Sequence, residues 1–197
     1  KVAGSATFQA GLVELQDVAS QAVVETLALR KGQRILDYCA GGGGKALALA
    51  ALADSAVDAW DSDAARMQDI AKRAERAGAD ITCLTEKPSG QYDIVLCDVP
   101  CSGSGAWRRA PQGKWLLTSE RLTQLGNVQG DILQQAARLV SPGGVLVYTT
   151  CSLLAQENMD QLAKFTEATP GWICDFSRQF LPIEGGDGFF VGHLRSV

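Results

Sequence analysis

The sequence predicts an α/β protein in which helices cover both faces of a parallel sheet. Short apolar runs alternate along the chain with longer helical patterns, an order typical of strand–helix–strand units. Four consecutive glycines follow the first of these runs, where a strand would turn sharply into a helix. The chain has 197 residues, of which 46% are hydrophobic and 20% charged. We therefore expect one domain over residues 1–197, with a helical lead-in over 1–30 and the α/β core over 31–197.

The individual elements follow from periodicity and from turn signals. The run 92–97 is apolar enough to be a central strand. Ser62 or Asp63 is a suitable N-cap and Gly78 a suitable C-cap for one helix, and residues 141–144 (Ser-Pro-Gly-Gly) predict a turn. Strands are expected at 34–38, 56–60, 81–84, 92–97 and 145–149, with a last strand from a hairpin at 189–194, and helices at 16–29, 45–52, 63–78 and 119–140.

Charge and apolar runs exclude several classes of protein. The net charge of −4 argues against a protein that binds nucleic acid nonspecifically along its length, because such proteins are basic. It does not exclude binding of nucleic acid by a local basic segment. The longest purely apolar run, residues 46–53, is far shorter than a bilayer span of roughly 20 residues, and residues 1–5 begin no signal peptide. Because the chain does not begin with Met, we expect it to come from a longer protein. We also expect it to be a monomer and to be located in the cytoplasm.

The six cysteines favour free thiols over disulfides. Disulfide frameworks belong to short secreted chains with little core, which this chain is not. With no C-x-x-C pair and one histidine, His193, a zinc site is not expected.

The glycine loop after the first strand indicates a nucleotide-like ligand. A Walker P-loop fails, because Cys39 replaces its first glycine and Ala46 its Ser/Thr. A dinucleotide fingerprint fits weakly through Gly41, Gly43 and Ala46. S-adenosylmethionine explains the acid Asp37 just before the loop, since a carboxylate suits a cationic amino group and repels a pyrophosphate.

Two cysteines follow predicted strands in the phrases Asp98-Val99-Pro100-Cys101 and Thr149-Thr150-Cys151-Ser152. A thiolate is a strong nucleophile, so this pair above a cofactor loop suggests covalent chemistry. The alternative for either cysteine alone is a small buried hydrophobe.

The stretch 107–115 combines three cations with two indoles and no acid. It suits phosphate contacts and base stacking. The alternative is a solvated loop that its tryptophans anchor to the core.

Several different motifs follow one another along the chain, at residues 16–20, 37–45, 98–105, 108–115, 150–152 and 187–190. In this combination they resemble the Sun/Fmu family of RNA cytosine-5 methyltransferases. The resemblance implies a Rossmann-like class I methyltransferase fold, with a mostly parallel seven-stranded sheet and an antiparallel last strand. It also implies S-adenosylmethionine as cofactor and RNA, most often ribosomal RNA of the 16S type, as substrate.

The resemblance implies roles for individual residues. Cys151 would be the nucleophile, Cys101 would assist product release and Asp98 would face the cytosine, whereas in related DNA enzymes the cysteine of the Pro-Cys motif attacks. The RNA contacts would be Arg108, Arg109 and Lys114. The cofactor contacts would be Asp37, Cys39, Ala40, Gly41, Gly42, Gly43, Gly44, Lys45, Asp61, Glu86, Asp98 and Pro100.

The chain departs from the family pattern in its glycine loop. Gly41 and Gly42 stand at the usual Ala-Pro positions and Ala46 at the usual Thr, while Glu86 is the nearest acid after the third strand. Two alternatives therefore stay open, namely an inactive RNA-binding or scaffold module with this fold and a transfer-RNA methyltransferase.

Overall fold

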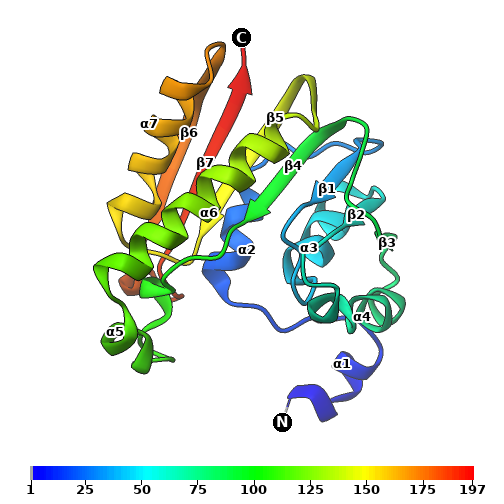
Figure 1. Cartoon of the computed structure of the whole chain (residues 1–197). Coiled ribbons are helices and arrows are strands. Elements are labelled where there is room, and N and C mark those ends of the chain that lie inside the picture. The colour runs from blue at the N-terminus through cyan, green and yellow to red at the C-terminus, as the bar shows by residue number, and fades with distance from the viewer. Residues whose placement is uncertain (1) are drawn as a thin grey trace.

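A seven-stranded sheet in the order β3-β2-β1-β4-β5-β7-β6 forms the centre of the protein (Figure 1). The computed structural model describes residues 2–197. The first five strands in chain order pair in parallel, and β7 is antiparallel to both β5 and β6. The strands are β1 (Ile35–Asp37), β2 (Val57–Ala59), β3 (Ile81–Cys83), β4 (Tyr92–Asp98), β5 (Val140–Thr150), β6 (Trp172–Phe180) and β7 (Phe189–Ser196).

Helices cover both faces of this sheet, as the sequence predicts (Figure 1). The α-helices are α1 (Ala6–Gln9), α2 (Val18–Glu25), α3 (Gly44–Ala53), α4 (Ile70–Ala77), α5 (Gln112–Leu116), α6 (Ser119–Ala137) and α7 (Met159–Ala168). Short 3₁₀ turns occupy η1 (Val2–Gly4), η2 (Ala64–Met67), η3 (Ser104–Ala106), η4 (Ala155–Glu157) and η5 (Pro182–Glu184).

Alternating side chains of the strands build two apolar cores. In β4, Ile94 and Leu96 pack with α2, α3 and α4, whereas Val95 and Cys97 pack with α6 and α7. A strand buried on both faces needs a continuous apolar run, and residues 94–97 supply it, which is why this strand is recognisable in the sequence.

Most expected elements are confirmed, and two differ. The helix expected over 63–78 is divided into η2, capped by Asp63, and α4, which ends at Gly78 with φ 62°. Residues 141–144 are a bulge inside β5, because the register moves from Tyr92↔Val140 to Ile94↔Val145. The sequence analysis did not identify α7 or the hairpin partner β6.

The parallel strands β2, β1, β4 and β5 lie side by side, so their carboxyl ends meet at one edge of the sheet. In open α/β sheets this edge is where ligands bind. No helix among residues 2–197 combines the length and the apolar character that crossing a membrane requires.

Candidate active site

The two cysteines predicted to react lie next to each other. Cys151 directly follows β5, and Cys101 follows β4 after a three-residue step. The register that pairs Asp98 with Thr149 makes the two loops leave the sheet together. The Sγ atoms of Cys101 and Cys151 are 3.4 Å apart, and both side chains are half-buried.

The two thiols differ in acidity. The hydrogen bond with Cys101 lowers the pKa of Cys151, and the nearby Lys45 ammonium lowers it as well, against the effects of burial and of the Asp98 charge. The same hydrogen bond, together with burial, raises the pKa of Cys101. The two pKa values are shifted in opposite directions, so Cys151 ionises more readily than Cys101, and the ionised thiol is the nucleophilic form.

A partly buried ion pair connects the glycine loop to the Cys101 loop. Lys45, in the first turn of α3, places its Nζ 2.6 Å from Oδ2 of Asp98, at the end of β4. The Lys45 side chain is 7% exposed and its ammonium lies 4.8 Å from the centre of the Phe189 ring. The Lys45 ammonium therefore faces the catalytic loops.

The glycine loop is folded around Asp61. Gly41 (φ 49°) and Gly43 (φ 79°) adopt left-handed backbone that other residues rarely take. The Gly41 N–H donates to Oδ2 of Asp61 at 2.9 Å, and the Arg66 guanidinium pairs with the same oxygen at 3.0 Å. Asp61 thus already holds the loop in shape.

Asp37, at the end of β1, is fully buried, and neither of its oxygens meets the geometry of a hydrogen bond among the described residues. Burial, helped by the charge of Asp98, raises its pKa from 3.8 to about 7. The Cys39 N–H lies close enough to lower the pKa of Asp37, but this effect is smaller than that of burial. Asp37 lines a cleft of about 220 Å³ together with the glycine loop. An unpaired carboxylate there suits a ligand that carries positive charge.

A model of the family described as 16S rRNA methyltransferase RsmB/F matches residues 24–195. The chain belongs to the RsmB/F family. Among curated proteins, it is 36% identical to ribosomal RNA small subunit methyltransferase B of Proteus mirabilis and 38% identical to that of Xylella fastidiosa. Each alignment covers 95% of this chain but 47% and 49% of those relatives. The chain therefore spans about half their length.

Solved structures share the fold. The structure of PH0851 superposes with a TM-score of 0.90 at 28% identity, over 98% of this chain and 49% of that one. NSun6 from Pyrococcus horikoshii, solved with SFG, gives a TM-score of 0.89 at 22% identity, over 100% and 56% of the two chains. The expected class I methyltransferase fold is confirmed.

The structure brings most of the expected RsmB/F cofactor residues together. The cleft is lined by Asp37, Cys39, Ala40, Gly41, Gly42, Gly44, Lys45 and Asp98, with Gln16, Ser20 and Arg66 in addition. Four expected residues do not line the cleft, namely Gly43, Asp61, Glu86 and Pro100. Asp61 is buried and reaches the loop through the Gly41 N–H, whereas Glu86 and Pro100 are exposed beyond β3 and β4. Residues 2–197 contain no cluster of ligating side chains that could hold a metal.

In the basic stretch 107–115, two of the three cationic side chains form ion pairs within the protein. Arg108 and Arg109 both pair with the buried carboxylate of Asp187, yet their side chains remain 64% and 61% exposed. Trp115 is 80% exposed beside Lys114, whereas Trp107 is half-buried. Trp107 therefore fits the alternative that a tryptophan anchors this loop to the core, whereas Trp115 does not.

Sequence reasoning missed several residues that hold the site. Glu157 lies beneath both cysteine loops, Asp187 holds the two arginines and Arg66 covers Asp61. Neither Glu157 nor Arg66 is marked by a spacing or motif in the sequence, because each contacts the site through side chains from a separate segment.

Proposed function

We propose that this chain methylates carbon 5 of a cytosine in 16S ribosomal RNA, with S-adenosylmethionine as methyl donor and Cys151 as nucleophile. The observation that carries the proposal is the Cys101–Cys151 pair, 3.4 Å apart beside the Lys45–Asp98 ion pair. Membership of the RsmB/F family supports the substrate, because the curated relatives are named as ribosomal RNA methyltransferases.

The cofactor would be held by the glycine loop and two carboxylates. The unpaired Asp37, which lines the cleft, offers a partner to the amino group. Asp61 lies buried behind Arg66 and would offer acceptors to the ribose hydroxyls. Because Arg66 already pairs with Asp61, a ribose bound there would displace this exposed guanidinium. The structural neighbour solved with SFG, an analogue of S-adenosylmethionine, supports the choice of ligand.

The reaction needs a nucleophile because carbon 5 of cytosine is too electron-poor to accept a methyl group directly. The Cys151 thiolate adds to carbon 6, and the new S–C bond makes carbon 5 an enamine carbon that can be alkylated. The bound cofactor supplies an electrophilic methyl group. Asp98 accepts from the cytosine amino group and so orients the ring, while the Lys45 ammonium paired with Asp98 offsets the negative charge that thiolate addition puts on the ring.

Release reverses the addition. A base removes the proton from methylated carbon 5, and the electron pair expels the Cys151 thiolate by breaking the S–C6 bond. Cys101, the protonated member of the pair, is placed to donate to the departing thiolate sulfur. We assign Cys101 to this release step.

The target base must leave its stack to reach the thiols. Arg108, Arg109 and Lys114 are the proposed phosphate contacts. Buried Asp187 fixes both arginines, while more than half of each side chain stays exposed to solvent. The exposed Trp115 adds a face on which a neighbouring base can stack.

Two cysteine variants test the mechanism. With 16S RNA and S-adenosylmethionine, Cys101→Ala should attack and methylate but stall at release, so a protein–RNA adduct accumulates on denaturing gels. Cys151→Ala should form no adduct and no 5-methylcytosine. Swapped phenotypes would assign the attack to Cys101, and bisulfite sequencing of RNA from cells with and without the gene would identify the cytosine.

A further inference from the structure

Glu157, the last residue of η4, is a fully buried carboxylate with four donors. Its Oε1 accepts from the backbone N–H of Ser102 at 2.8 Å and from Nε2 of Gln129 at 3.1 Å. Its Oε2 accepts from the hydroxyls of Ser102 at 2.5 Å and Ser152 at 2.6 Å. Every lone-pair direction of the carboxylate is therefore used.

The two serines are the residues that follow the two cysteines. Ser102 follows Cys101 and Ser152 follows Cys151, so one carboxylate ties the two loops together directly behind the thiols. The neighbouring Asn158 adds a second tie on one side, because its Nδ2 donates to the Ser152 carbonyl at 2.9 Å.

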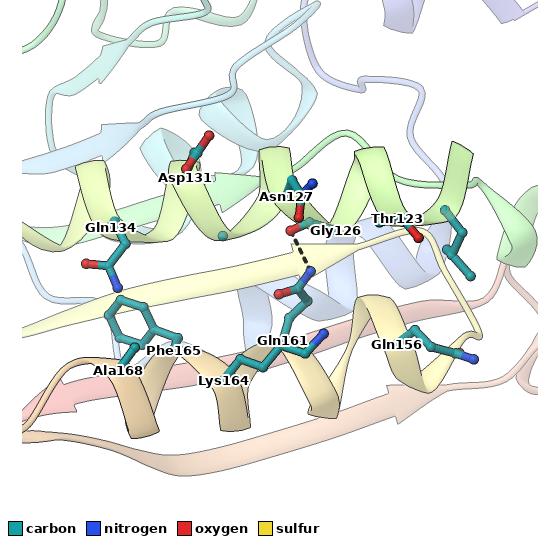
Figure 2. A pocket seen from close by; sticks show the side chains of 12 residues that line it. Thr123, Gly126, Asn127, Asp131, Gln134, Gln156, Gln161, Lys164, Phe165 and Ala168 are labelled. Atoms are coloured by element: carbon teal, nitrogen blue, oxygen red, sulfur yellow. Dashed lines mark hydrogen bonds between the residues drawn. The ribbon is translucent and has the colours of Figure 1, made fainter. Parts of the chain in front are cut away.

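The helices α6 and α7 hold Glu157 from the other side. Gln129, fully buried in α6, accepts from Nε2 of Gln161 in α7 at 3.2 Å. Figure 2 shows the Gln161 amide directed at the carbonyl of Gly126, at 2.7 Å, across the groove between the two helices. The Tyr148 hydroxyl donates to the Glu157 carbonyl at 2.6 Å. The carboxylate is thus fixed by rigid elements.

A carboxylate in the interior is costly even when it is fully hydrogen-bonded, and well-packed apolar residues often serve stability equally well. Its value here lies in geometry, since one side chain contacts both loops at once through the hydroxyls of Ser102 and Ser152. We infer that Glu157 is a positioning residue that sets the distance between the Cys101 and Cys151 thiols. The inference rests on the proposed function only in taking these thiols as the reacting groups.

The charge of Glu157 acts in the same direction. It contributes to the raised pKa of Cys101, although less than the hydrogen bond to Cys151 and burial do. The carboxylate thereby favours the protonated form of Cys101 as well as its position.

A crosslinking reagent tests the distance without RNA or cofactor, so its result is independent of the proposed methylation. Dibromobimane becomes strongly fluorescent when its two bromomethyl groups have alkylated two neighbouring thiols. Peptide mapping would identify the Cys101–Cys151 product among the six cysteines, and the single variants Cys101→Ala and Cys151→Ala should not form it.

Three variants distinguish the positioning of the two thiols by Glu157 from a general loss of packing around them. Glu157→Ala should slow the crosslink by about tenfold or more, because both loops lose a charged acceptor. Glu157→Gln should crosslink near the parent rate, since the serine hydroxyls can accept from the new amide. Thr149→Val is the matched control: it removes a buried hydrogen bond, to the Phe190 carbonyl at 2.6 Å, from the same region.

The outcomes decide the inference. If Glu157→Ala does not fold, the double variant Ser102→Ala/Ser152→Ala takes its place and should show the same slow crosslinking. A parent rate in whichever of these two folds would overturn the inference, as would the absence of a Cys101–Cys151 crosslink in the parent. A loss as large in Thr149→Val would show that general loosening, rather than Glu157, controls the distance.

Discussion

Replacing Asp37 by Asn should make the protein less sensitive to alkaline pH. Asp37 is fully buried and unpaired, and its pKa is raised from 3.8 to about 7. The folded protein therefore binds a proton at this carboxyl more tightly than the unfolded chain does. Stability is lost as pH rises from about 4 to about 7 and levels off above that range.

The size of the effect follows from linkage. A tenfold difference in proton affinity corresponds to about 1.4 kcal/mol, so ionised Asp37 costs the folded state ~4 kcal/mol at pH 8. At pH 5 most of this cost is absent, because the folded carboxyl is protonated. The advantage of Asp37→Asn over the parent should therefore grow by about 2–3 kcal/mol between pH 5 and pH 8.

Urea unfolding at pH 5 and pH 8 measures this difference. The penalty for an unpartnered Asn amide is independent of pH and cancels. Burial lowers the pKa of His193 to about 4, which changes stability in the opposite direction, but His193 is present in both proteins and cancels as well. Asp131→Asn, at an exposed site on α6, controls for the lost charge. An advantage that stays constant with pH would refute the assignment of an unpaired, buried carboxylate.

The remaining predictions concern the loop around the cleft. Asp61→Ala should weaken S-adenosylmethionine binding by roughly 1–3 kcal/mol in calorimetry, because ribose hydroxyls lose their acceptor; unchanged affinity would remove Asp61 from the site. Gly42→Pro should raise the free energy of unfolding by about 0.4–1 kcal/mol, since Gly42 lacks a positive φ and its N–H has no partner among the described residues. A lower melting temperature in that variant would contradict this view of the loop. Lys45→Met should raise the pKa of Cys151 and slow its alkylation by iodoacetamide at neutral pH by roughly threefold to tenfold, whereas Lys45→Arg should not.

The sequence predicted those elements whose apolar pattern reflects full burial. β1 and β4 are buried on both faces, and their continuous apolar runs end at the acids Asp37 and Asp98. β6 lies at the sheet edge with most side chains exposed, so its pattern is not that of a buried strand. In α7 the large buried apolar side chains are Leu162 and Phe165, a stripe too short to predict a helix with certainty.

For the site, residue identity was predictable but relative placement was not. The motif phrases identified Cys101 and Cys151, and parallel pairing explains why their loops are neighbours. The 3.4 Å distance depends on Glu157, which lies in a separate turn and contacts both loops through side chains. Such contacts between distant segments leave no periodicity in a single sequence. Glu86 was expected to contact the cofactor because it is the nearest acid after the third strand, but it is not among the residues that line the cleft.

The placement of Lys45 links the two halves of the site. Lys45 belongs to the helix that begins at the glycine loop, but its ammonium pairs with Asp98 and lowers the pKa of Cys151. A cationic ligand at Asp37 would lie near the same ammonium, because Lys45 and Asp37 line one cleft and Lys45 already lowers the pKa of Asp37. Two cations repel at this range, so ligand charge and the position of Lys45 are coupled. The pKa of Cys151 should therefore depend on what occupies the cleft, and this effect needs no contact between the ligand and Cys151.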